Sequence, residues 1–219
     1  MRKRETTYDN SFLGSPILQY RKQHIGLDEN ILMPIIQRYD DMLEKHCRVF
    51  AFRFDVHLPK NVEDSDNKHF SRFQAHFIKK EKRAGYDPAY VAVREKSDDD
   101  GVHYHEVVLV DGNATGNIFY HIKNANDAFN SEFGFAPGSK SGLINDCTKD
   151  KHGQPQENGV LIERDSSKRK NAEGKSFRHA SYLGKVAQKD PSKGTRELFA
   201  SRLTKLSPLE RTMRKDIES

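Results

Sequence analysis

Residues 90–110 read YVAVREKSDDDGVHYHEVVLV, and this stretch decides the fold. Its two ends are rich in β-branched and aromatic residues, which favour strands, so we expect strands at 88–96 and 103–110. The polar segment 97–101 between them has the composition of a turn. Two such strands joined by a short turn pair as an antiparallel hairpin. The sequence therefore predicts a central β-hairpin.

Further strands and helices are expected on both sides of this hairpin. Residues 48–58, RVFAFRFDVHL, place an apolar side chain at every second position, which is typical of a half-buried strand. Asp28 is suited to cap a helix and Gly85 to end one. The expected elements are helices at 29–45, 67–84, 115–133, 181–187 and 196–206, strands at 48–58 and 160–164, a long loop at 134–157 and a basic loop at 166–175. This order indicates an α+β fold, an antiparallel sheet with helices packed on it.

The length of 219 residues suits one domain with extended ends. We expect a loosely packed arm at 1–26, the main domain at 27–190 and a basic helical tail at 191–219.

Positive charge is concentrated toward the end of the sequence. Residues 164–219 contain 15 Lys and Arg against 7 Asp and Glu, whereas residues 1–163 contain 22 against 25. A basic segment on a near-neutral body suits a polyanionic partner such as nucleic acid. An ordinary solvated tail would give the same count, so charge alone leaves both interpretations open.

The sequence argues against three classes of protein. Cys47 and Cys147 form no CxxC pair, which excludes a zinc ribbon. The mean hydropathy is −0.87, and the apolar run 31–36 is too short to span a bilayer. The basic N-terminus precedes no apolar stretch, unlike a secretory signal. We expect a soluble, cytoplasmic protein without a membrane partner.

A metal site is expected on the hairpin. His103 and His105 lie two residues apart on a strand, so both imidazoles lie on one face and offer two positions to a divalent metal. Glu95 lies on the preceding strand and faces them if the register allows, whereas Glu106 points to the opposite face. Carboxylate and imidazole together suit Mg²⁺ or Mn²⁺ acting on phosphate. A His-x-His pair by itself favours an ordinary strand with surface histidines.

Tyr182 and Lys185 are the candidate catalytic pair. They lie three residues apart on an expected helix and therefore share a face. A tyrosine hydroxyl can attack a phosphodiester and retain the DNA end covalently, but its pKa near 10 requires a nearby cation or a polarised phosphate. Lys185 is placed to supply that cation. A core aromatic beside a solvated lysine would give the same pattern.

Together these motifs resemble the HUH endonuclease superfamily, in particular its rolling-circle replication initiators. The family signature is a motif strand, a carboxylate, a His-hydrophobe-His and a downstream Tyr-x-x-Lys, which match 48–58, Glu95, 103–105 and 182–185 in the same order. Relaxases carry their tyrosine before the histidines. More narrowly, the chain resembles filamentous-phage replication proteins and the prophage YagK/YfjJ group, over roughly residues 45–190. Tyr104 is aromatic where the family has an aliphatic residue.

The resemblance implies a site-specific single-strand DNA endonuclease and ligase that initiates rolling-circle replication of a phage or mobile element. Tyr182 would form a 5′-phosphotyrosine, Lys185 would steady the phosphate, and Glu95, His103 and His105 would hold Mg²⁺ or Mn²⁺. The expected partners are single-stranded or hairpin DNA at an origin and, because no Walker A motif occurs, a helicase of the bacterial host or element. Residues expected to contact DNA are Arg53, Lys168, Arg169, Lys170, Lys175 and Arg178.

Two alternatives remain open. A single-tyrosine transposase or recombinase would use the same chemistry on element ends, and the sequence does not separate it from a replication initiator. A non-catalytic DNA-binding regulator could retain the fold, and it would bind DNA without Tyr182 or metal. We found no second tyrosine one helical turn from Tyr182, which argues against a two-tyrosine mechanism.

Overall fold

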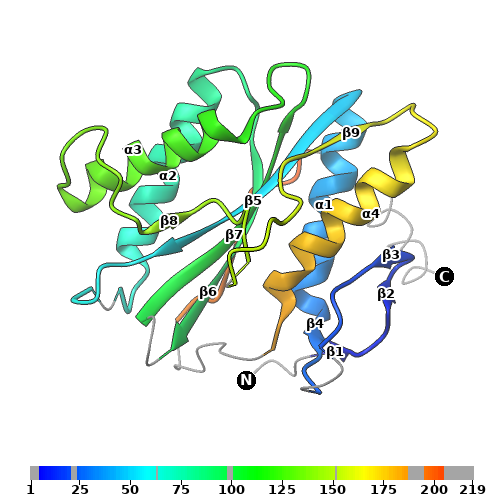
Figure 1. Cartoon of the computed structure of the whole chain (residues 1–219), viewed down its shortest axis with the longest axis horizontal. Helices are drawn as coiled ribbons and strands as arrows, with labels where there is room; N and C mark the ends of the chain where they lie inside the picture. Colours follow the sequence, from blue (N-terminus) through cyan, green and yellow to red (C-terminus); the bar gives the residue numbers. More distant parts are fainter. Residues whose placement is uncertain are drawn as a thin grey trace.

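A six-stranded antiparallel sheet with two pairs of helices forms the body of the molecule (Figure 1). The computed structural model describes residues 5–20, 24–62, 64–97, 101–150, 152–186 and 195–204. The strand order is β10-β6-β7-β5-β8, and β9 also pairs with β5. The bounds are β5 Arg48–His57, β6 Ala89–Ser97, β7 Gly101–Asp111, β8 Ile144–Asn145, β9 Val160–Glu163 and β10 Leu198–Ala200.

Within the described residues, four α-helices cover both faces of this sheet. They are α1 Glu29–Lys45, α2 Lys68–Arg83, α3 Ile118–Phe133 and α4 Arg169–Ala180. Helices α2 and α3 lie on one face, and α1 and α4 lie on the other (Figure 1). Within the described ranges, no helix has the length and apolar character needed to cross a membrane.

The predicted α+β class and most of its elements are confirmed. The Asp28 side chain accepts a hydrogen bond from the Asn30 backbone N–H at 2.9 Å and begins α1 as expected. The hairpin is formed by β6 and β7, which pair in register from Ala89 opposite Leu109 to Ser97 opposite Gly101. The turn residues 98–100 lie outside the described part of the chain.

Alternation along β5 and β7 divides the interior into two cores. Phe50, Phe52 and Phe54 face α2 and α3, while Val49 and Ala51 face α1 and α4. This follows from the period of two along a strand, which sends neighbouring side chains to opposite faces. The motif histidines share the α1 and α4 face with Val49 and Ala51, so the candidate site lies on that side.

The segment around Tyr182 differs from the expectation. The predicted basic loop at 166–175 is largely part of α4, and the predicted helix at 181–187 is a short 3-10 turn at Ser181–Gly184. Both predictions were wrong because tertiary packing decides here. Gly174 allows α4 to pack tightly against Pro16, since a Cβ at position 174 would lie 3.1 Å from the Pro16 Cγ.

The two ends of the chain contribute to the fold more than the sequence indicated. The expected loose arm at 1–26 buries Phe12 and Ile17 in the α1 and α4 core. Residues 198–200, expected to be helical, instead form β10 and pair with β6. The sheet therefore extends beyond the predicted domain boundary at 190. The rest of the expected helical tail, from residue 205 onward, lies outside the described residues.

Tyr104 ties the hairpin to the segment before α2. Its ring stacks on Phe70 with the ring centroids 3.7 Å apart, and its hydroxyl lies 3.0 Å from Asp64 Oδ2 and 2.8 Å from Asn67 Oδ1. The aromatic residue between the two histidines is thus anchored on the face opposite to theirs. This contact fixes the strand that carries the histidines.

We expect Tyr104→Phe to lower the free energy of unfolding by about 1–3 kcal/mol, because the acceptors at Asp64 and Asn67 would lose a buried donor. Urea unfolding followed by circular dichroism measures the change. Tyr120→Phe is the matched control, since Tyr120 is 54% exposed and should leave stability unchanged. Equal stability of the two variants would contradict the proposed anchoring.

Candidate metal centre

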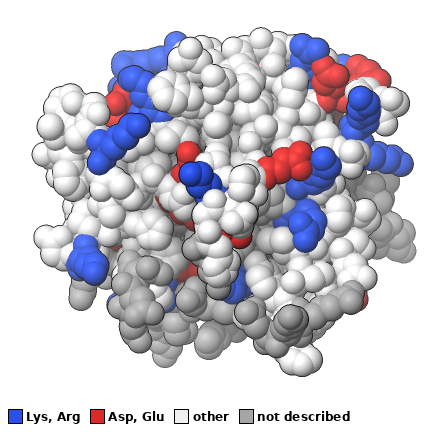
Figure 2. Space-filling model, viewed as in Figure 1, with Lys and Arg blue, Asp and Glu red and all other residues white. Residues whose placement is uncertain are grey.

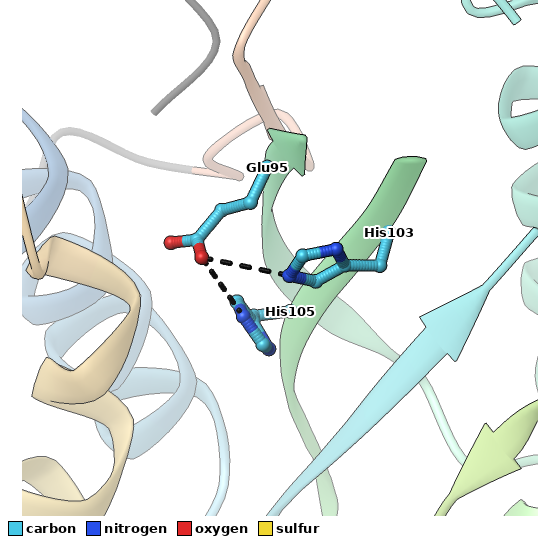
Figure 3. Close-up of side chains that lie close together, drawn as sticks. All are labelled: Glu95, His103 and His105. Atoms are coloured by element: carbon cyan, nitrogen blue, oxygen red, sulfur yellow. Dashed lines mark hydrogen bonds and ion pairs between the residues drawn. The ribbon is translucent and has the colours of Figure 1, made fainter. Parts of the chain in front are cut away.

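The register of the sheet brings Glu95, His103 and His105 together. Glu95 on β6 pairs directly with His103 on β7, and His105 follows two residues later on the same face. Figure 3 shows Glu95 reaching from its strand toward both imidazoles. The sequence left open whether the register would allow Glu95 to face the histidines. The observed register does allow it.

The three side chains form a tight, buried group. Glu95 Oε2 lies 3.3 Å from His105 Nε2 and 3.6 Å from His103 Nε2. One ligand atom of each residue lies within 4.8 Å of the other two, and none of the three residues is more than 4% exposed. This group could hold a metal ion.

Glu106, the weaker ligand candidate in the sequence, lies on the opposite face of the sheet. Its carboxylate accepts a hydrogen bond from Gln74 Nε2 at 2.6 Å in the core beneath α2. Burial raises the pKa of Glu106 to about 8. The sheet itself thus separates this carboxylate from Glu95, His103 and His105, which together are called the metal group below.

Hydrogen bonds orient both imidazoles for metal binding. The Nδ1–H of His105 donates to Asp55 Oδ1 at 2.6 Å, and the Nδ1–H of His103 donates to the Gly101 carbonyl at 3.3 Å. Each Nε2 then presents a lone pair toward Glu95. A cation would stabilise three electron-rich atoms that converge in a buried space, and metal-bound histidines commonly donate their other N–H to a carboxylate or carbonyl. The donor set fits a divalent metal.

Arg53 and Asp55 form a buried ion pair behind His105. Arg53 Nη2 lies 3.1 Å from both Asp55 carboxylate oxygens, and the two side chains are 8% and 9% exposed. Burial alone would raise the pKa of Asp55, but the Arg53 charge and His105 outweigh it and hold this pKa well below its usual value. Asp55 is therefore ionised and suited to orient the His105 ring.

Tyr182 lies against this assembly. Its ring meets the His105 ring edge to face with centroids 4.9 Å apart, and the Arg53 guanidinium carbon lies 3.9 Å from its centroid. Burial raises the pKa of Tyr182, and the Arg53 charge opposes this rise. The sequence placed Lys185 beside Tyr182, whereas the structure places Arg53 nearer to its ring.

Lys185 reaches Tyr182 without sharing a helix with it. It follows the 3-10 turn, its backbone bridges to Leu27, and its Nζ lies 5.7 Å from the centroids of both Tyr182 and Tyr20. The predicted proximity of Lys185 and Tyr182 is present, although its geometric reason was wrong.

A cavity of about 730 Å³ lies beside Tyr182. Its wall includes Tyr20 from the N-terminal segment, Arg53 and Asp55 from β5, and Arg178 and His179 from α4. The three candidate metal ligands do not line this cavity. Tyr182 therefore lies between the metal group, which it contacts through His105, and the cavity.

The residues expected to contact DNA fall into two places. Lys175 and Arg178 lie on the cavity wall, and Arg53 lies there too but is only 7% exposed and bound to Asp55. Lys168, Arg169 and Lys170 lie at the start of α4, where Arg169 pairs with Glu173 at 3.2 Å. On the face shown in Figure 2, basic side chains are interspersed with acidic ones and form no single patch.

Sequence reasoning missed or left undecided three residues of this region. The role of Asp55, on the strand expected at 48–58, stayed undecided because its position opposite His105 depends on the register of β5 and β7. Tyr20 and His179 carried no recognisable motif. Only the packing of the N-terminal segment and of α4 against the sheet brings them beside Tyr182.

Comparisons with known proteins bear on the family of this chain. No curated protein sequence matches it. Among solved structures, the catalytic domain of the adeno-associated virus type 5 Rep protein is similar at 12% identity and a TM-score of 0.37, covering 52% of this chain and 75% of that chain. The model of the YagK/YfjJ C-terminal domain matches residues 7–199. Because this match spans most of the sequence, the chain belongs to the YagK/YfjJ C-terminal domain family.

Proposed function

We propose that this protein is a metal-dependent, single-strand DNA nicking and joining enzyme with Tyr182 as its nucleophile. The observation that carries the proposal is the contact between the Tyr182 ring and His105, a member of the buried group that could hold a metal. A phenol beside a metal-binding group is suited to attack on a phosphodiester. The HUH resemblance of the sequence motifs supports the same reaction.

In the nicking step, one P–O bond forms and one P–O bond breaks. The Tyr182 oxygen attacks the scissile phosphorus, a P–O bond forms, and the bond to the 3′ oxygen breaks. The phenol proton passes to solvent, and the released 3′ oxygen gains a proton. The reverse attack by a 3′-OH on the phosphotyrosine rejoins the strand, so one site both nicks and joins.

The chain's own residues have distinct tasks in this scheme. Glu95, His103 and His105 would hold the metal, which would polarise the scissile phosphate and offset its developing charge. Asp55 orients His105, and Arg53 stabilises negative charge at the Tyr182 oxygen through its contact with the ring. Lys185 supplies a second positive charge near Tyr182 and the bound phosphate.

At the biological level, we propose initiation of rolling-circle replication of a phage or mobile element. The site would act on single-stranded or hairpin DNA at an origin, with Mg²⁺ or Mn²⁺, and a helicase would separate the strands. The 3′-OH left by the nick would prime synthesis. A transposase acting on element ends would use the same site, and transfer between two element ends in one reaction would distinguish it.

The nucleophile is tested with labelled single-stranded DNA, Mn²⁺ and denaturing electrophoresis. We expect a covalent protein–DNA band that is absent from Tyr182→Phe, because phenylalanine has no oxygen to attack phosphorus. Tyr120→Phe, which removes the hydroxyl of an exposed tyrosine in the first turn of α3, should form the band normally. If the wild-type protein binds a confirmed origin strand and forms no band, the non-catalytic DNA-binding alternative holds.

Metal binding is tested by thermal unfolding with and without Mn²⁺. At a concentration about 100 times the dissociation constant, the ion should stabilise the fold by about 2.7 kcal/mol, which raises Tm by roughly 5–10 °C in a chain of this size. Glu95→Gln should largely abolish the shift, because it removes the charged ligand but keeps the shape. An unchanged Tm in the wild-type protein at millimolar Mn²⁺ would argue against a metal site.

Asp55 is tested separately as the group that orients His105. We expect Asp55→Asn to weaken Mn²⁺ binding by about 10- to 100-fold while leaving all three ligands in place. Isothermal titration calorimetry measures the affinity. Asp66→Asn is the control, since this exposed carboxylate pairs with Lys68 away from the site. An affinity equal to that of the wild type would show that Asp55 has no effect on the ligands.

A further inference from the structure

We propose that the cavity beside Tyr182 binds one unpaired nucleotide of the DNA strand that is cut. This inference rests on the proposed function, because it identifies the part of the substrate next to the scissile phosphate. The volume of about 730 Å³ lies in the range of roughly 300 to 1,000 Å³ that small-ligand sites occupy. A base turned out of a helix would fit such a space.

Two aromatic rings on its wall make the cavity suitable for binding a nucleobase. Tyr182 and Tyr20 both line it, and Lys185 Nζ lies 5.7 Å from each ring centroid. Nucleic-acid sites for single strands commonly stack bases on aromatic side chains, and each stacked base contributes about 1–3 kcal/mol. Tyr182 is engaged by Arg53 and His105, which leaves Tyr20 as the ring suited to stack on a base.

The segment that carries Tyr20 is held to the Tyr182 segment by backbone contacts. The Leu18 backbone N–H donates to Ser181 Oγ at 2.9 Å, and the Val186 N–H donates to the Gly26 carbonyl at 3.2 Å. Leu27 also bridges to Lys185. Tyr20 is therefore fixed on the cavity wall by contacts on both sides of it, and the site is preformed.

His179 supplies a group suited to hydrogen-bond with a base. Its Nε2 is buried and makes no hydrogen bond among the described residues, and its side chain lines the cavity. Such an unsatisfied buried atom is costly unless a partner occupies it. Burial and the Arg53 charge lower the pKa of His179 to about 4, so the ring is neutral at physiological pH and has one donor and one acceptor nitrogen.

The charges around the cavity suit the phosphates of a DNA strand that enters and leaves it. Lys149 and Arg178 line the cavity and form no ion pair within the described ranges, so both are available to phosphates. The lining acids are already engaged: Asp55 binds Arg53, and Glu157 pairs with Lys175 at 3.3 Å. Asp150 accepts backbone N–H groups from His152 and Gln154.

The test uses the full chain and a short oligothymidylate with 2-aminopurine at its centre, in chelator so that no cleavage occurs. Stacking quenches 2-aminopurine fluorescence, so we expect quenching on binding to the wild-type protein. Tyr20→Leu should abolish the quenching and weaken binding by at least about fivefold, in line with the loss of one stacked base. Tyr20→Phe should restore both, because it keeps the ring.

The control variant is Tyr120→Leu, which removes an exposed tyrosine of α3 outside the cavity and should behave as wild type. His179→Leu should reduce the differences in affinity among oligonucleotides of the four bases. Tight binding without quenching, unchanged by Tyr20→Leu, would overturn the proposal. Free thymidylate competing as well as the oligonucleotide would also overturn it, since the ligand would then be a mononucleotide.

The outcome for the cavity is independent of the outcome for the enzyme. Quenching that depends on Tyr20, together with no covalent band in Mn²⁺, would support the nucleotide site and reject the nicking reaction. A covalent band without Tyr20-dependent quenching would support the reaction and reject the nucleotide site.

Discussion

One lone-pair atom from each of Glu95, His103 and His105 points into a shared buried space. None of these three residues is more than 4% exposed. Such a group is unfavourable unless a cation occupies the space between the three side chains. The protein maintains it by fixing the partners on every side. β6 supplies the carboxylate, β7 the imidazoles, and β5 the Asp55 that holds His105. Register between three strands is therefore the constraint on which the site depends.

The opposite face of the sheet explains how this register is held. Phe52, Phe54 and Tyr104 point away from the histidines into the core under α2 and α3, where Tyr104 stacks on Phe70. A slip of one residue would move each of these rings to the polar face and each histidine into the aromatic core. Burial of the apolar side chains on one face thus fixes the strand register, and the register fixes the positions of the site residues on the other face.

The residues of the site come from several separate segments of the sequence. Its metal group comes from one hairpin, but the Tyr182 contact, the Arg53 and Asp55 pair, and Tyr20 come from segments that lie far apart in the chain. The buried Arg53 and Asp55 pair contacts His105 through Asp55 and Tyr182 through Arg53. A change at either residue of the pair would therefore alter both the metal group and the tyrosine, which links the two halves of the site.

The sequence by itself determined the α+β class, the hairpin and the shared face of His103 and His105, because strand period and a short turn are local properties. The register of β6 and β7 decided that Glu95 lies beside both histidines. The sequence did not determine α4, β10 or the place of residues 5–20, because close packing at Gly174 and pairing with β6 involve residues distant in sequence. The roles of Asp55, Tyr20 and His179 were decided only by the tertiary structure. Each depends on which neighbour it faces across the sheet or cavity, and single-sequence patterns do not encode that neighbour.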